Sequence, residues 1–202
     1  MKKLKIDESY VYVVPVIHGL VEEGKKVEKA FDEVIPECIA IGISPEDIEA
    51  IKNKDDEIPS QYEHYLVNLS HYGKISIPPS DIKMAYEISV TKGIPLHAID
   101  VDDDEYADLL IKNVSTISLI KYSRKIKKLG KKNFKARDAE EFIREWDEYM
   151  TSIKSFKKIE EAREKKMAEN VKELCKKCKK MLVIVPMERY DGFIERLERY
   201  KK

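Results

Sequence analysis

The sequence has little glycine, little cysteine and no excess of either charge. Its 202 residues include 7 glycines and 3 cysteines, and 38 basic residues balance 38 acidic ones. A formal net charge of zero argues against attraction of the whole protein to nucleic acid or to a membrane surface, because such attraction needs a field of one sign. Three cysteines are too few for a disulfide scaffold.

Long apolar runs are also missing. No segment approaches the roughly 20 apolar residues that a membrane-spanning helix needs. Asp7 and Glu8 interrupt the basic N-terminus before any apolar segment begins, so no signal peptide fits. We therefore expect a soluble, cytoplasmic protein. Charged residues make up 38% of the chain, and this Lys- and Glu-rich composition is similar to that of thermophile proteins.

Two of the cysteines, Cys175 and Cys178, form the motif "CKKC" within a helical pattern. A four-thiolate zinc site needs a second pair of ligands, which the sequence lacks. We expect both to be ordinary helix residues. A redox pair, a stabilising crosslink and a metal site remain the alternatives.

Four short segments predict β-strands, because each is rich in β-branched or aliphatic residues and is bounded by breakers. They are residues 10–16, 37–43, 95–100 and 181–186. Their apolar character is nearly continuous rather than alternating. This pattern is typical of strands that are buried on both faces, as in parallel sheets.

Helical patterns separate these strands. Between residues 102 and 179 no strand pattern occurs, and the periodicity predicts helices at about 103–114, 116–129, 137–150 and 153–179. The sequence therefore predicts an α/β fold with a mainly parallel sheet and flanking helices. We expect one domain, residues 1–202, with a large helical insertion at about 103–179 before the last strand.

Polar residues follow the predicted strands. His18 follows the first, Asp100 and Asp102 end the third, and Glu188 and Arg189 follow the last. Ligands of open parallel sheets bind beyond the carboxyl ends of the strands, so these side chains are expected at one rim, where they suit a metal, an anion or a carbonyl group. The alternatives are that His18 is a structural hydrogen-bonding residue and that the acidic run after residue 100 only begins a helix.

The first and last predicted strands share a weak internal sequence similarity. In both, a proline near the strand end is followed three positions later by a polar residue, His18 or Arg189, and then by a glycine and a helix. This similarity suggests two related corners in the fold.

Arg163 lies on the apolar stripe of the predicted late helix, between Ile159 and Met167. A buried guanidinium without an anionic partner is costly. We therefore expect Arg163 to meet Asp100, Asp102, the neighbours of Glu164 or a bound anion, either as part of a site or as a purely structural ion pair.

In their order, several segments resemble the motifs of the TraB/PrgY family, within the grouping that includes Tiki proteases, ChaN and erythromycin esterase. The segments are "PVIH" (15–18), "AIGIS" (40–44), "DIKMAYE" (81–87), "AIDVDD" (98–103), "AREKKMAENV" (162–171) and "VPMERYDGF" (185–193). The resemblance covers nearly the whole chain. It implies an α/β domain and, from the Tiki-like relatives, metal-dependent hydrolysis supported by histidines and a glutamate.

The chain departs from the family pattern at five positions. Pro15 and Pro186 replace motif glycines, Gly42 replaces the glutamate, Val101 replaces an arginine, and Arg189 replaces the last histidine. The membrane region of many members is also not seen at the C-terminus, which ends in "ERLERYKK". We therefore expect a degenerate member.

The residues that keep a family-like identity, together with the rim residues, form the candidate site. The catalytic candidates are His18, Asp100, Arg163 and Glu164, and the binding candidates are Asp81, Asp102, Glu188 and Arg189. If the site uses a cofactor, a divalent metal with His18 as ligand is the expectation. Loss of the glutamate and one histidine leaves fewer than the three protein ligands that a tightly held transition metal usually has.

Three functions remain open. The first is an altered-site relative that binds a small molecule or peptide without catalysis. A fold does not fix function, so a lost site is compatible with a preserved scaffold. The second is a peptidase- or esterase-like hydrolase that uses a metal or a carboxylate–histidine pair at the strand ends.

The third is binding of nucleic acid or an anionic surface through residues 121–135, where 8 of 15 residues are Lys or Arg and where Tyr122 and Phe134 are candidates for stacking. Lys-rich helix faces are common in charged proteins, so we do not expect nucleic acid to be a partner. A homodimer in which this segment pairs with the acidic run at 100–108 is an alternative.

Overall fold

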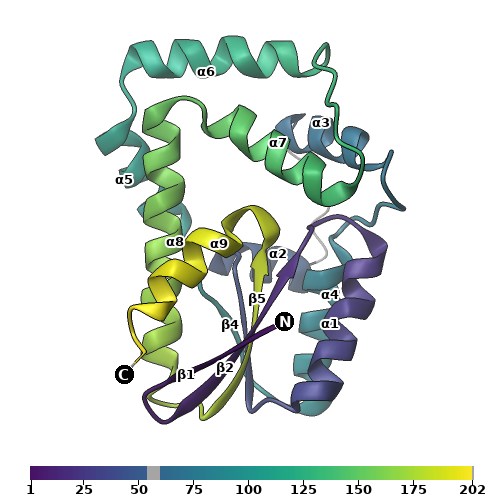
Figure 1. Ribbon diagram of the computed structural model, residues 1–202, viewed down its shortest axis with the longest axis vertical. Coiled ribbons are helices and arrows are strands. Elements are labelled where there is room, and N and C mark those ends of the chain that lie inside the picture. Colours follow the sequence, from purple (N-terminus) through teal and green to yellow (C-terminus); the bar gives the residue numbers. More distant parts are fainter. Residues whose placement is uncertain (54–59, 202) are drawn as a thin grey trace.

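A mostly parallel sheet with helices on both faces forms the centre of the molecule (Figure 1). The computed structural model describes residues 1–53 and 60–201. Within these residues the sheet has five strands in the order β1-β2-β5-β3-β4. The strands are β1 (Lys2–Ile6), β2 (Ser9–Val16), β3 (Cys38–Ile41), β4 (Leu96–Ala98) and β5 (Lys180–Pro186). β2, β5, β3 and β4 are parallel, and only β1 is antiparallel to its neighbour.

The predicted α/β class and the four predicted strands are confirmed, and β1 is an addition. In β1 only Leu4 and Ile6 are buried, and lysines occupy the alternate positions. This alternation is typical of an edge strand, where lysines discourage pairing with another chain. The lysines give the N-terminus the appearance of a basic leader, which is why the strand was not predicted.

Two layers of helices cover the sheet (Figure 1). α1 (Val21–Val34) and α4 (Ser80–Lys92) lie on one face, and α8 (Lys154–Leu174) and α9 (Met187–Glu198) lie on the other. Successive residues of β5 therefore enter two different cores: Val183 packs with residues of α8 and α9, and Ile184 packs with residues of α1 and α4. Burial on both faces explains the continuous apolar run of this strand.

A tier of helices lies beyond the carboxyl ends of the parallel strands (Figure 1). The helices in and next to this tier are α2 (Pro45–Asn53), α3 (Ser60–Leu69), α5 (Asp103–Asn113), α6 (Thr116–Leu129) and α7 (Ala139–Thr151). α3 and α7 pack on the end of β2 through a cluster that includes Ile17, Leu69 and Phe142. Residues 102–179 contain helices and no strand, as expected. None of the helices within residues 1–53 and 60–201 combines the length and the apolar composition that a membrane crossing needs.

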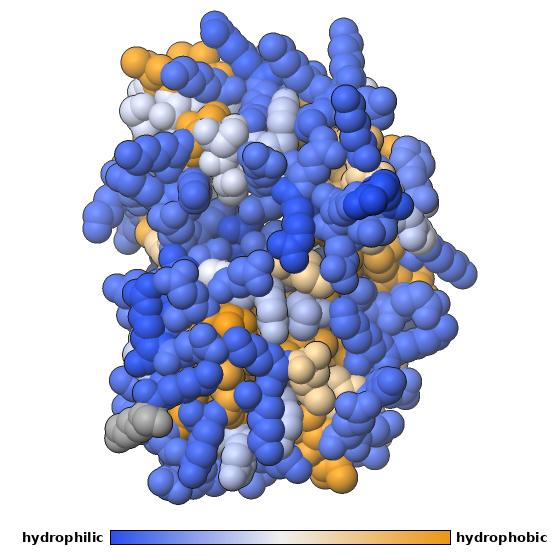
Figure 2. Space-filling model, viewed as in Figure 1, coloured by the Kyte–Doolittle hydropathy of each residue, from blue (hydrophilic) through white to orange (hydrophobic). Residues whose placement is uncertain are grey.

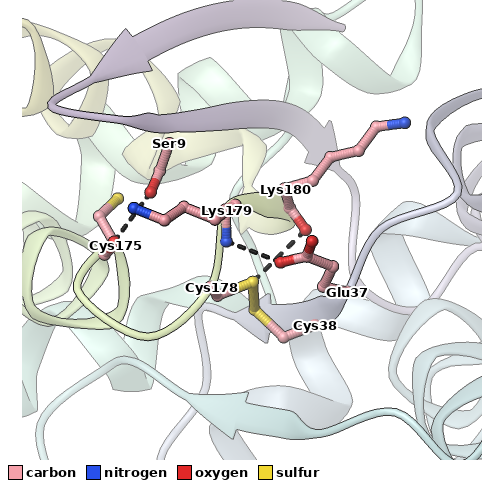
Figure 3. The surroundings of a disulfide bond; sticks show 7 residues. All are labelled: Ser9, Glu37, Cys38, Cys175, Cys178, Lys179 and Lys180. Atoms are coloured by element: carbon pink, nitrogen blue, oxygen red, sulfur yellow. Dashed lines mark hydrogen bonds between the residues drawn. A yellow bond between two sulfur atoms is a disulfide. The ribbon is translucent and has the colours of Figure 1, made fainter.

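A disulfide joins the starts of two neighbouring strands (Figure 3). Cys178, just before β5, is bonded to Cys38 at the start of β3, 140 residues away in the sequence. The expectation that Cys175 and Cys178 are both helix residues is wrong, because α8 ends at Leu174 and the chain then turns toward β5. Cys175 is a free, buried cysteine, and burial raises the pKa of its thiol to about 11.

Reduction of the Cys38–Cys178 disulfide is expected to lower the free energy of unfolding by about 2–5 kcal/mol, because the crosslink closes a long loop in the unfolded chain. Thermal unfolding followed by circular dichroism, with and without a phosphine reductant, measures this loss. The Cys38→Ala variant without reductant should match the reduced wild type and should not respond to reductant. Cys175→Ala should keep the wild-type response, and an equal response in Cys38→Ala would contradict the crosslink.

Candidate functional site

The pairing of β2 with β5 brings two corners of the chain together. The last pair in this ladder is Val16 with Pro186, so the residues two positions further along each chain, His18 and Glu188, lie beside each other at the carboxyl edge. The weak internal similarity between the first and last predicted strands therefore corresponds to two adjacent strand ends. The prolines are offset by one residue in the register, and for this reason Glu188 rather than Arg189 is the neighbour of His18.

His18 is held by a buried carboxylate. Its Nδ1 lies 2.6 Å from Oδ2 of Asp81, which is fully buried in the first turn of α4. The Tyr65 hydroxyl donates a hydrogen bond of 3.0 Å to the His18 carbonyl and so fixes the backbone at the corner. The Nε2 atom is buried and has no hydrogen-bond partner among the described residues. The ring is therefore oriented through Nδ1, whereas Nε2 is buried and unpaired among the described residues.

Charge at this corner favours the imidazolium form. Burial lowers the pKa of His18, but the charge and hydrogen bond of Asp81, together with the carboxylates of Glu188 and Asp47, raise it to about 9. Burial also raises the pKa of Glu188, an effect that His18 and Arg163 oppose. Glu188 thus lies within electrostatic reach of both His18 and Arg163. At neutral pH the Nε2–H of His18 is a charged donor that finds no acceptor within residues 1–53 and 60–201.

Arg163 meets the carboxylate that its position on an apolar stripe predicts. Its Nη2 lies 2.5 Å from Oδ2 of Asp100, and its Nε donates to both oxygens of Asp100 at 3.2 Å. Nη1 donates to Glu160 at 2.8 Å. Each nitrogen of the guanidinium therefore has a carboxylate partner. The contact between Arg163 and Asp100 is confirmed, and a catalytic role for either residue stays a prediction.

Arg189 and Glu164 belong to a buried ionic cluster between α7, α8 and α9. The Arg189 guanidinium contacts Asp147 of α7 and lies 3.6 Å from Glu160 and 3.5 Å from Glu164 of α8. Glu164 also lies 2.8 Å from Arg196, and burial raises the pKa of Glu164 to about 7. The cluster joins three helices, so the contacts of Arg189 and Glu164 are with protein groups.

Gly192 makes room for this cluster. A Cβ atom at position 192 would overlap the carboxylate of Glu164. The glycine therefore lets α9 approach α8 closely enough for Arg196 and Glu164 to pair.

Asp102 has a structural role at the start of α5. Its carboxylate accepts a hydrogen bond of 2.7 Å from the Glu105 amide, and the Glu105 side chain accepts one of 3.3 Å from the Asp102 amide. This reciprocal pair is a capping box at the start of α5. The arrangement agrees with the alternative that the acidic run begins a helix, and binding by Asp102 stays a prediction.

A polar cleft of about 590 Å³ adjoins the corner that contains His18. It lies between α7 and the first turns of α8 and α9, and Glu188 is part of its wall. Arg144, Glu148, Lys154 and Lys157 line it as well. The face seen in Figure 2 is mostly hydrophilic between the helical tier and the sheet layers. Glu188, the neighbour of His18, is thus part of the cleft wall, whereas His18 itself does not line the cleft.

Two tyrosines of α3 complete the surroundings of His18 and were missed by the sequence analysis. The rings of Tyr62 and Tyr65 stack with centroids 5.3 Å apart. Burial, together with the nearby carboxylates of Asp81 and Glu188, raises the pKa of both hydroxyls. The three-residue spacing in "QYEHY" puts both rings on one helix face, and this spacing was the available signal.

The residues at the rim do not fit a tightly held transition metal. Among residues 1–53 and 60–201, no group of three or more His, Cys, Asp or Glu side chains is arranged to hold one. At Gly42, where the family pattern has glutamate, a Cβ atom would lie 2.9 Å from Cδ of Pro186 and 3.2 Å from Sδ of Met167. The place of the missing ligand is therefore filled by packed side chains. Arg189, at the position of the missing histidine, is engaged by carboxylates.

The basic segment 121–135 does not present its aromatic rings for stacking. Tyr122 stacks on Phe156 of α8, with centroids 4.0 Å apart and planes 13° apart. Phe134 packs edge-on against Phe142 of α7, with centroids 5.2 Å apart. Both rings contact other parts of the chain, so the expectation that they are available to bases is wrong.

No model of a protein family matches the chain, and no curated protein matches it. The resemblance to the TraB/PrgY family therefore depends on the sequence segments alone. Four of these segments lie at or just beyond the carboxyl ends of β2, β3, β4 and β5, where a site of an open parallel sheet belongs.

The raised pKa of His18 predicts a pH-dependent contribution to stability. A folded-state value of about 9 against 6.5 in the unfolded chain gives a contribution of about 3 kcal/mol that is fully present below pH 6.5 and is lost as the pH rises through 9. Histidine-edited NMR should show the titration near pH 9, and Asp81→Asn should lower it. Unfolding of His18→Gln should lack this part of the pH dependence, whereas the exposed-site variant His71→Gln should retain it. Titration of His18 near 6.5 in the wild type would contradict the dyad.

The Arg163–Asp100 contact predicts a large effect of removing the cation. Arg163→Met should lower the free energy of unfolding by about 3 kcal/mol, because Asp100 remains buried with an unpaired charge. The double variant Asp100→Asn/Arg163→Met should recover part of this loss in denaturant titrations. Lys165→Met, on the exposed side of the same helix, is the control, and an equal effect in that variant would contradict the prediction.

Proposed function

We propose that this chain is a TraB/PrgY-like protein that binds a small molecule or peptide at the carboxyl edge of its sheet without turning it over. The observation that supports this proposal is the Nε2 of His18, which is buried and lacks a partner among the described residues. Buried polar groups in proteins are nearly always hydrogen-bonded. A ligand oxygen would supply the missing acceptor.

The chemistry around His18 indicates which kind of ligand oxygen would accept a hydrogen bond from Nε2. The imidazolium of His18 is oriented by Asp81 at 2.6 Å, so Nε2–H is a charge-assisted donor with a fixed direction. Carboxylate, phosphate and carbonyl oxygens are its natural acceptors. Charges of both signs line the adjoining cleft: Lys154 and Lys157 are accompanied by the carboxylates of Asp147, Glu148, Glu188 and Asp191, so the preference for an anionic oxygen comes from the imidazolium itself. A ligand that carries a carboxylate, such as a short peptide or an organic acid, fits these features.

The same features argue against catalysis at neutral pH. A general base needs a lone pair, and a pKa of about 9 keeps Nε2 protonated under those conditions. Arg163 has a carboxylate at every nitrogen, so it is not free to stabilise an oxyanion. The rim also lacks the ligands for a tightly held metal, as described above for residues 1–53 and 60–201.

A hydrolase that uses the Asp81–His18 pair is the second candidate. The hydrogen bond that Asp81 accepts from Nδ1 of His18 orients the imidazole as a general base requires. Such an enzyme would work only where Nε2 loses its proton, so its rate would increase as the pH approaches 9. Nucleic-acid binding has less support, because Tyr122 and Phe134 are packed against other helices.

The proposal is tested by observing His18 directly during a ligand screen. Two-bond histidine NMR spectra should show a saturable shift of Nε2 with members of a panel of dipeptides, dicarboxylates and phosphates. His18→Gln should weaken the binding of each hit about 10-fold or more, as expected for loss of a hydrogen bond to a charged group. His71→Gln, at an exposed histidine, is the matched control and should bind as the wild type does.

Two outcomes would contradict this proposal. Hits whose affinity is unchanged in His18→Gln would show that the ligand does not use Nε2. Turnover of ester or peptide substrates that increases toward pH 9 and disappears in His18→Gln would instead support the hydrolase.

A further inference from the structure

A cluster of exposed aliphatic side chains lies where α5 meets α6. Ile111 of α5 and Ile117, Leu119 and Ile120 of α6 are between 47 and 82% exposed. We call this cluster the α5–α6 corner. It is visible as orange atoms at the upper left of Figure 2, above the position of α5 in Figure 1. A group of exposed aliphatic residues on an otherwise hydrophilic surface marks a place of association.

α6 is attached to the rest of the molecule along one side only. Tyr122 stacks on Phe156, and Leu129 is buried. On the opposite side, Ile117 and Ile120 share a face with Arg124 and Lys128, because residues three, four and seven positions apart lie above one another on a helix. The outer face of α6 thus begins with the aliphatic Ile117 and Ile120 and continues with the exposed cations Lys121, Arg124 and Lys128.

The N-terminal part of α5 is acidic, opposite in charge to the second half of α6. Asp103, Asp104 and Asp108 are exposed on α5, and Ile111 follows them on the same helix. Along the continuous segment 103–128, exposed side chains therefore run from acidic through apolar to basic. Within the described part of the chain, these aspartates and the cations Arg124, Lys127 and Lys128 form no ion pair. Their charges remain available to a partner.

We propose that the α5–α6 corner is the interface of a two-fold symmetric homodimer. A two-fold rotation about the corner packs the isoleucines of two copies together and reverses the order of charges in one of them. The acidic end of α5 in each copy then faces the basic end of α6 in its partner. A self-complementary pattern of this kind favours a second copy over an unrelated protein. The acidic α5 argues against an anionic membrane as the occupant, and the zero net charge of the chain removes long-range repulsion between copies.

Sedimentation analysis of the full chain tests this proposal. The wild type should dimerise at low salt, and added salt should weaken the dimer because the charge contacts are exposed. Ile117→Glu/Ile120→Glu should increase the dissociation constant at least about 10-fold. Val67→Glu/Val90→Glu, at two other exposed sites, is the matched control and should dimerise as the wild type does, with folding of all variants verified by circular dichroism.

A charge exchange tests the arrangement of the two copies. Arg124→Glu/Lys128→Glu makes both ends of the corner acidic, and Asp104→Lys/Asp108→Lys makes both ends basic. Each variant alone should be monomeric, whereas an equimolar mixture should form a heterodimer in which both charge contacts are restored. A wild type that stays monomeric up to about 100 µM, whether or not it binds anionic vesicles, would overturn the proposal. A dimer that survives Ile117→Glu/Ile120→Glu, or a mixture that fails to pair, would also overturn it.

Discussion

The parallel pairing of β2 with β5 is the contact on which the rest of the structure depends. It joins the second and the last strands of the sheet across more than 160 residues of intervening chain. Its register places His18 next to Glu188, and its two faces divide the aliphatic residues between the two cores. The disulfide from Cys38 to Cys178 lies at the opposite end of β5. One strand is therefore tied covalently at its start and borders the candidate site at its end.

The carboxyl edge of this sheet holds several buried charges, and nearly all of them are paired. Isolated charges in a protein interior are destabilising by several kcal/mol, and partners with good geometry offset most of this cost. Asp100 has Arg163, Glu164 has Arg189 and Arg196, and Asp81 has His18. In the dyad itself, Nε2 of His18 and Oδ1 of Asp81 are buried without a hydrogen-bond partner among the described residues, and this is why the pair is of functional interest. The cluster around Arg189 also holds α7, and with it the helical tier, over the edge where His18 lies.

Much of the fold follows from local patterns in the sequence. The strands β3 and β5 are buried on both faces, and this requires the unbroken apolar runs from which they were predicted. β2 and the half-buried edge strand β4 were predicted from their apolar residues and flanking breakers, and the charged, alternating β1 lacks both signals. The contact of Arg163 was predicted because a cation on an apolar stripe requires an anion. The partner of Cys178 was not predicted, because nothing near Cys38 identifies it across 140 residues.

The site was predicted less completely, since it depends on helix phase and strand register. Arg189 was expected at the rim beside His18, but neighbouring residues of a helix point about 100° apart. When Glu188 faces His18, Arg189 must face α7 and α8. The pairing of His18 with Asp81 likewise requires α4 to lie against α1, a packing arrangement that no residue pattern specifies. Tyr62 and Tyr65 enter the site from α3, a helix outside the predicted set.

The tight packing at Gly42 has a consequence for how this chain can change during evolution. Met167 and Pro186 occupy the volume that a side chain at position 42 would need, and both belong to elements that carry the core. Any larger residue at position 42 must be preceded or accompanied by a smaller one at 167 or by a displaced strand end at 186. Substitutions at position 42 are therefore coupled to changes at Pro186 and Met167, because a side chain at 42 forces one or both of them to shift.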